Sequence, residues 1–162
     1  MTKSENVYVF QEFEKDAAGV KYHFLSKGIR RIVKIVEYEY IGLVGGKRTY
    51  NLGFGSYNQI DNKIQDDEIS ANGDAYKVFN TVLSTIPHFL NYYPDVMIMV
   101  GGSDSARSFL EMCRLNCKKK CLPPVCKNAH RRIAIYKKFV NKNWAILTQE
   151  YNFWGGIKTS DY

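Results

Sequence analysis

The residues best suited to chemistry lie in a polar turn, Gly102-Ser103-Asp104-Ser105-Ala106-Arg107, which follows an apolar run at 96–100. The run is typical of a strand covered on both faces, and the Ser and Asp residues are typical of a helix start. A strand that turns at glycines into a helix points free N–H groups and the positive end of the helix dipole at one spot. We therefore predict an anion site in which Gly102, Ser103 and Ser105 supply donors and Arg107 supplies a forked guanidinium.

This turn also has a purely structural interpretation. It lacks the glycine spacing and the lysine of a P-loop, and it lacks the GxGxxG pattern of dinucleotide-binding folds. The alternative is therefore a capped helix whose Arg107 pairs with a carboxylate, either Asp74 or Asp104.

Carboxylates gather upstream of this turn, at Asp61, Asp66, Asp67, Glu68 and Asp74. Converging carboxylates hold Mg²⁺ in enzymes of phosphoryl chemistry, so Asp67, Asp74 and Arg107 are the candidate catalytic residues. The alternative is a solvated acidic loop followed by a helix cap, because the spacing matches no known catalytic signature. The sequence calls for no cofactor, and Mg²⁺ or Zn²⁺ is an option only.

Four cysteines lie within fourteen residues, at Cys113, Cys117, Cys121 and Cys126. Thiolates are zinc ligands, and His130 is an alternative fourth ligand. The spacing differs from the paired CxxC knuckles of structural zinc sites, so core side chains without metal are the competing interpretation. A cytoplasmic location, which the absence of an apolar leader suggests, disfavours disulfides.

Positive charge is concentrated in the last third of the chain. The net charge is +7, yet residues 112–149 hold ten Lys and Arg residues and no Asp or Glu. Such clustering favours an acidic partner, with RNA or DNA the commonest kind, and an acidic protein as an alternative. The residues expected to bind nucleic acid are Lys118, Lys119, Lys120, Arg131, Arg132 and Lys137. A solvated basic face without a partner is the competing interpretation.

Alternating apolar residues predict the strands that must position these groups. The expected strands cover about 7–13, 20–25, 31–41 and 50–54, with a turn at 45–47. Glycines at 53 and 55 suggest a bulge or the close approach of another backbone or a ligand. Residues 58–68 are typical of a loop that includes a short edge strand at most.

Two helices and a final hairpin complete the prediction. Asn72 or Asp74 caps a helix over about 75–92, which Pro87 should kink or end early. A second helix covers 107–117, and residues 132–140 and 144–153 form a hairpin. We expect one α+β domain over residues 1–162, with an antiparallel or mixed sheet packed on one face by two helices and a frayed tail at 155–162. No apolar run is long enough to cross a membrane, and the oligomeric state is not predicted.

Several phrases together resemble one family of small bacterial proteins that is known only as a domain of unknown function. They are Phe24-Leu25-Ser26-Lys27-Gly28, residues 31–36, Tyr50-Asn51-Leu52-Gly53-Phe54-Gly55, Ser70-Ala71-Asn72-Gly73-Asp74, and Gly102-Ser103 with Arg107. The resemblance covers about Tyr22 to Met112, and the Lys/Cys-rich stretch 118–126 departs from it. It implies a bacterial, cytoplasmic α+β protein and assigns no catalytic residue.

Three functions follow from these features. The first is binding of a phosphate-bearing partner, with RNA or DNA along the basic last third of the chain and one phosphate at the Gly102–Arg107 turn. The second is a small toxin-type nuclease or nucleotide-processing enzyme of a toxin–antitoxin or defence system. The third is a protein-interaction module, such as an antitoxin or immunity protein, whose basic face meets an acidic protein.

Overall fold

The computed structural model of the chain describes residues 6–58, 60, 63–65, 72–101, 107–119, 121–122 and 126–154. The chain divides into two compact units, residues 1–103 and 104–162. The first unit contains a β-sheet and one helix, and the second contains helices. The expectation of one domain stays a prediction, and the expected frayed tail lies outside the described residues.

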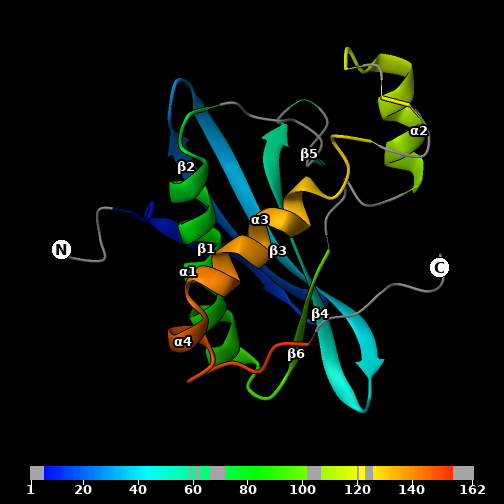
Figure 1. The fold of residues 1–162 in the computed structure, drawn as a ribbon. Helices are drawn as coiled ribbons and strands as arrows, with labels where there is room; N and C mark the ends of the chain where they lie inside the picture. Colours follow the sequence, from blue (N-terminus) through cyan, green and yellow to red (C-terminus); the bar gives the residue numbers. More distant parts are fainter. Residues whose placement is uncertain are drawn as a thin grey trace. The chain divides into compact units, whose positions relative to one another are not determined.

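The first unit is built on a six-stranded sheet of mixed direction (Figure 1). Five strands form an antiparallel meander in chain order: β1 (Phe10–Asp16), β2 (Gly19–Lys27), β3 (Arg31–Val44), β4 (Lys47–Asn58) and β5 (Lys63–Gln65). The sixth, β6 (Met97–Val100), pairs with β4 in parallel. The four long predicted strands and the short edge strand are thus confirmed, as is the α+β class with a mixed sheet.

Two strands, β6 and β5, pair with the same edge of β4, one after the other along its length. Thr49 to Leu52 pair with β6, and Ser56 to Asn58 pair with β5. The bulge expected at the glycines between these segments is wrong, because Gly53 and Gly55 stay in register with β3. The irregularity lies instead on β3, between Tyr40 and Gly42.

The turn between β3 and β4 is confirmed. Gly45 and Gly46 both have positive φ, at 57° and 78°. Tight hairpin turns that match the strand twist need positive φ at both central residues, which glycine adopts without strain.

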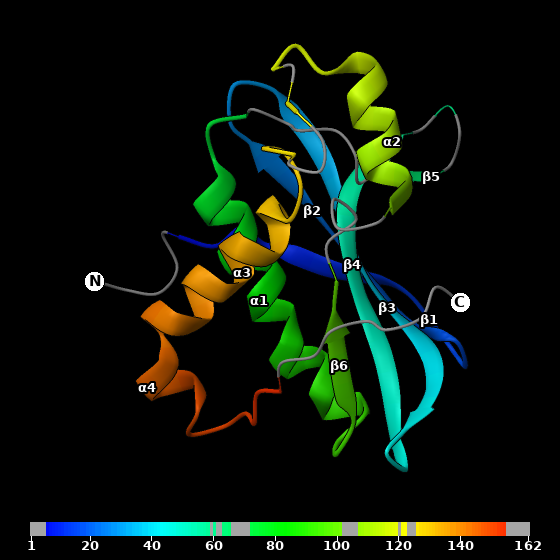
Figure 2. The same cartoon turned by 45° about the vertical axis from the view of Figure 1, so that its right-hand side comes forward.

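Helix α1 (Ala75–Tyr92) packs on one face of the sheet (Figures 1 and 2). The alternation predicted for β2, β3 and β4 places their apolar residues on this face, and the helix contributes Val78, Val82 and Phe89. At the centre, the rings of Tyr38 and Phe89 stack at 4.1 Å between centroids. The sheet residues of this core are Val20, Tyr22, Phe24, Val36, Tyr38, Tyr50 and Leu52.

Two expectations about this unit need correction. Pro87 lies inside α1 without ending it, because the helix continues to Tyr92; the early end is therefore wrong, and the kink stays a prediction. The strand β6 is not covered on both faces, because Met99 is 47% exposed. A short run of apolar residues cannot distinguish a covered strand from one that borders the sheet, since both carry the same residue types.

The second unit is helical where a hairpin was expected. Its elements are α2 (Arg107–Asn116), as predicted, then α3 (Arg131–Lys142) and α4 (Trp144–Leu147). The hairpin prediction is wrong, because the less exposed positions 132, 133, 136, 139 and 140 recur at the spacing of a helix face. Within the described ranges, no helix has the length and hydropathy that a membrane crossing requires.

Candidate functional site

The predicted anion turn is described only at its last residue. Gly102, Ser103 and Ser105 lie outside the described residues. Arg107 begins α2, and its side chain is 85% exposed. Its Nε lies 3.8 Å from Oε1 of Glu111, one helical turn away. Asp104, one of its two expected partners, lies outside the described residues. An exposed pair of this kind contributes only a few tenths of a kcal/mol, so it does not withhold the guanidinium from another anion.

Most of the predicted nucleic-acid residues are exposed on the second unit. The side chains of Lys118, Lys119, Arg131 and Lys137 are exposed, Arg132 is half-buried, and Lys120 lies outside the described residues. The Lys119 ammonium donates to Oδ1 of Asn128 at 2.8 Å. The structure thus leaves these cations at the surface, where a polyanion can reach them.

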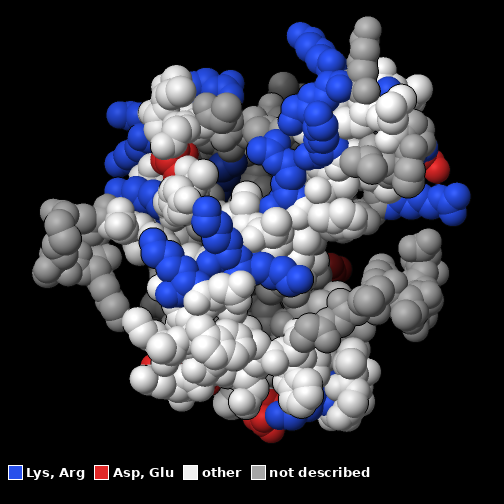
Figure 3. All heavy atoms as spheres, viewed as in Figure 1, with Lys and Arg blue, Asp and Glu red and all other residues white. Residues whose placement is uncertain are grey.

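Helix α3 adds a feature that the hairpin prediction concealed. Arg131, Lys138 and Lys142 are exposed and are separated by seven and four residues. On a helix these separations bring the three side chains to one face, about 10 Å and about 6 Å apart along the axis. No described carboxylate forms an ion pair with any of the three. We call this set the α3 stripe, and Figure 3 shows blue Lys and Arg side chains along the surface where Figure 1 draws α3.

Aromatic side chains follow the α3 stripe in the chain. Trp144 is 49% exposed, and its ring lies 5.5 Å from that of Phe153. Trp154 is 86% exposed. Exposed indole faces stack on unpaired bases, so these residues suit a single-stranded nucleic acid.

In the first unit, Asp74 belongs to a hydrogen-bond network that sequence reasoning did not find. Its Oδ2 accepts from the Tyr8 hydroxyl at 2.7 Å and from the Ser26 hydroxyl at 2.5 Å. Asp74 stands at the N-cap position of α1 yet makes no side-chain cap bond, so the expected capping chemistry is wrong. Two hydroxyl donors hold the carboxylate instead.

Asn72 extends this network to the turn between β2 and β3. Its Oδ1 accepts from the Arg30 amide at 2.7 Å, while its Nδ2 donates to Ser26 Oγ and to the Arg30 carbonyl, both at 2.9 Å. Ser26 is fully buried and Asn72 is 2% exposed. A substrate cannot reach Ser26, so this network is not a nucleophile with its base. We call the hydrogen-bonded side chains of Tyr8, Ser26, Asn72 and Asp74 the clasp, because they hold distant segments of the first unit together.

Two buried polar residues carried a signal in the sequence. Ser26 follows Val20, Tyr22 and Phe24 at spacings of two, so the alternation itself puts a hydroxyl on the core face. Lys34 shares that face and is 5% exposed, and its ammonium donates to Ser56 Oγ at 2.8 Å. A polar residue in register with a buried row indicates a buried hydrogen bond.

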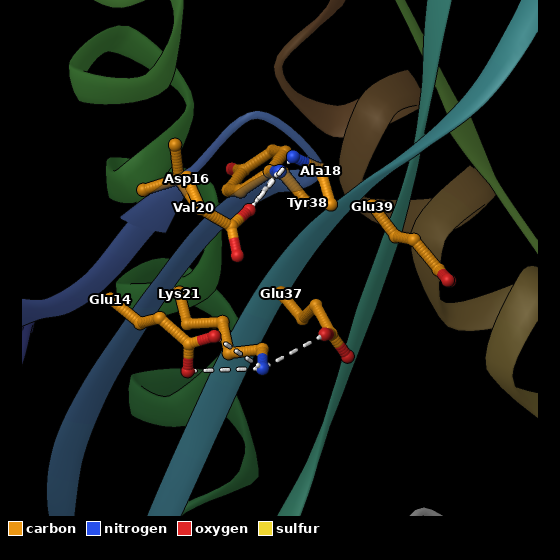
Figure 4. Close-up of a pocket in the computed structure, with 9 residues that line it drawn as sticks. Glu14, Asp16, Ala18, Val20, Lys21, Glu37, Tyr38 and Glu39 are labelled. Atoms are coloured by element: carbon orange, nitrogen blue, oxygen red, sulfur yellow. Dashed lines mark hydrogen bonds and ion pairs between the residues drawn. The ribbon is translucent and has the colours of Figure 1, made fainter.

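A small hollow lies where β1, β2 and β3 meet (Figure 4). Its volume is about 90 Å³, well below what small-molecule pockets need. Its one cation is already paired: the Lys21 ammonium lies 3.1 Å from Glu14 and 3.6 Å from Glu37. Asp16 accepts from the amides of Ala18 and Gly19. The hollow is therefore too small to serve as a substrate site.

The four cysteines of the second unit are free thiols. The Sγ atoms of Cys113 and Cys126 lie 3.9 Å apart, and the Asn128 amide donates to Cys113 and Cys117 at 3.4 and 3.5 Å. Three or more Asp, Glu, His or Cys side chains already enclosing one metal position are not found among the described residues.

The enzyme hypothesis receives no assembled site from these residues. Asp74 is held by the clasp in the first unit, Arg107 belongs to the second unit, and Asp67 lies outside the described residues. The three candidates were grouped by residue type alone. Residue type does not show whether a carboxylate already accepts hydrogen bonds from other side chains, as Asp74 does.

Comparisons with known proteins place the chain in a family. A model described as a family of unknown function (DUF6934) matches residues 4–119, which spans the sheet, α1, β6 and α2. Neither the curated proteins nor the solved structures contain a match to the chain. Because the family model covers well over half of the sequence, the chain belongs to the family of unknown function DUF6934.

Proposed function

We propose that this protein binds nucleic acid through its second unit, with the phosphate backbone running along the α3 stripe. The observation that carries the proposal is the alignment of Arg131, Lys138 and Lys142 on one exposed helix face without a described carboxylate partner. Unopposed cations at regular spacing suit a chain of phosphates, because each contact releases condensed counterions.

Single-stranded RNA or DNA is the form that the surroundings favour. Trp144 and Trp154 present exposed ring faces, and unpaired bases stack on aromatic rings regardless of sequence. Arg107, which belongs to the same unit, would hold a further phosphate. The proposal includes the bacterial cytoplasm as the setting, as the sequence suggests.

The test is a titration of fluorescently labelled single-stranded RNA and DNA, and of matching duplexes, with the full chain at several salt concentrations. Replacement of two stripe residues, Lys138→Gln with Lys142→Gln, should weaken binding roughly tenfold at low salt. The slope of log affinity against log salt should become shallower by about 1.5, since each lost phosphate contact removes about 0.7 to 0.9.

A matched control separates local contacts from net charge. Lys27→Gln with Arg31→Gln removes the same charge from exposed positions of the first unit. It should leave the affinity within about twofold, because neither residue belongs to the proposed contact and salt screens charges outside it. Equal weakening by both double variants, or no binding by the unmodified chain, would refute the proposal. Stronger capture of an acidic protein than of nucleic acid would favour the interaction-module alternative.

A further inference from the structure

We propose that Cys113 and Cys126 are a peroxide-sensitive pair of thiols, which closes to a reversible disulfide within the second unit. The family description assigns no such site, and the family match ends at residue 119, between the two cysteines. Oxidation of the pair does not require nucleic-acid binding, so each proposal can fail without the other.

The contact between the two sulfurs is the first argument. The Sγ atoms of Cys113 and Cys126 lie 3.9 Å apart, and both thiols are free. A disulfide has an S–S length of about 2.05 Å, so rotation of the two side chains has to bring the sulfurs closer by about 2 Å. Both residues belong to the second unit and are partly exposed, so a small oxidant reaches them without any movement between the units.

The hydrogen-bond donors around the pair are the second argument. The Asn128 side-chain amide donates to Cys113 Sγ at 3.4 Å. Backbone N–H groups of Asn128 and Ala129, together with the nearby Arg114 guanidinium, lower the pKa of the Cys126 thiol. Thiolates react with peroxide, and redox-sensing cysteines are accessible thiols of this kind beside a second cysteine. Cys126 therefore reacts first, and Cys113 closes the disulfide.

The oxidant is a peroxide, with hydrogen peroxide as the simplest member of the class. The Cys126 thiolate attacks one oxygen, the O–O bond breaks, and the hydroxide that leaves takes up a proton to become water. Cys113 Sγ then attacks the resulting sulfenic sulfur, so that the S–S bond forms as the S–O bond breaks. The Cys113 proton leaves with that hydroxide as a second water. The two thiols lose two electrons, and the peroxide gains them.

The disulfide would join α2 covalently to the turn at 127–130, which leads into α3. It closes a short loop, and a cross-link restricts how far the linked segments separate when they open. Backbone amides of this turn should therefore exchange hydrogen with solvent more slowly in the oxidised chain than in the reduced chain. Equal exchange in both forms would refute this constraint.

The main experiment treats the reduced full chain with about one equivalent of hydrogen peroxide, alkylates the remaining thiols with iodoacetamide and maps the peptides by mass spectrometry. The principal product should be a Cys113–Cys126 cross-link, about 2 Da lighter than the dithiol, and a dithiol reductant should restore both thiols. Cys121 should be oxidised roughly tenfold more slowly. A principal disulfide between other cysteines, or sulfinic acid without a cross-link, would overturn the proposal.

Two single variants are matched controls, because each removes one thiol and keeps the pair. Cys117→Ser and Cys121→Ser should form the cross-link at a rate within about twofold of the unmodified chain. Cys113→Ser should stop at a sulfenic acid on Cys126, which dimedone traps. Loss of the cross-link in either control, or survival of all four thiols in the folded, unmodified chain, would refute the pair. Sulfenic acid on Cys117 or Cys121 in Cys113→Ser would refute the assigned order of reaction.

Discussion

At the residue scale, the clasp around Asp74 explains residues that first stood out as sequence phrases. Ser26 comes from the phrase at 24–28, and Asn72 and Asp74 come from the phrase at 70–74. The structure brings them together at the end of β2, where buried polar atoms satisfy each other. Each buried polar group left without a hydrogen bond costs about 1 to 3 kcal/mol. The side chains of Tyr8, Ser26, Asn72 and Asp74 therefore depend on one another for stability.

Two buried tyrosines should respond in opposite ways to the loss of a hydroxyl. The Tyr22 hydroxyl is buried and has no hydrogen-bond partner among the described residues, whereas the Tyr38 hydroxyl bonds Thr85 Oγ1 at 2.7 Å. Tyr22→Phe should therefore raise the free energy of unfolding by about 1 kcal/mol, and Tyr38→Phe should lower it by about as much. Urea denaturation of both variants at neutral pH checks this, and a loss of stability in Tyr22→Phe would contradict it.

At the element scale, the turn between β2 and β3 is fitted against the segment that leads into α1. The Ile29 amide donates to the Asn72 carbonyl at 2.9 Å. A Cβ on Gly28 would lie 1.8 Å from that same carbonyl oxygen. The glycine is thus required by close backbone approach, which no count of turn residues in the sequence reveals.

Gly28→Ala should lower the free energy of unfolding by about 2 kcal/mol or more, because backbone on both sides must shift. Gly53→Ala is the matched control, since a Cβ there has no neighbour closer than 4.0 Å. That change should be neutral or stabilising by a few tenths of a kcal/mol, because alanine restricts the unfolded chain. Thermal denaturation distinguishes the two, and equal effects would argue against the close approach.

The predictions of the core strands and of α1 succeeded, whereas the prediction for residues 132–140 failed. The core strands and α1 bury continuous rows, so their period of two or 3.6 is visible in the residues. Helix α3 has no fully buried side chain among its described residues. Its lysines and arginines hide the helical period, and its β-branched and aromatic residues resemble a strand.

At the scale of the whole molecule, buried phenols should set the response to alkaline pH. Burial raises the pKa of Tyr22, and burial with the nearby Asp74 carboxylate raises the pKa of Tyr8. The folded chain therefore keeps protons that the unfolded chain releases near pH 10, so stability falls as the pH rises above that value. The raised pKa of Lys21, held by Glu14, acts in the same direction.

Between pH 8 and 11 the free energy of unfolding should fall, and Tyr22 alone should account for about 1 kcal/mol of the decrease. The Tyr22→Phe variant should show a decrease smaller by that amount. Tyr76→Phe, at a position that is 76% exposed, should leave the decrease unchanged. Denaturation curves at both pH values decide the matter, and identical decreases in all three proteins would count against it.

The sequence by itself determined the sheet strands, α1 and α2, the α+β class and the concentration of positive charge after residue 111. These follow from local periodicity and composition, which each segment carries within itself. The tertiary structure alone decided that the Asp74 carboxylate accepts hydrogen bonds from Tyr8 and Ser26 and that the thiols of Cys113 and Cys126 lie 3.9 Å apart. It also placed three cations on one face of α3. Such contacts depend on which distant residues are brought together, and the spacing of residue types along one chain does not contain that information.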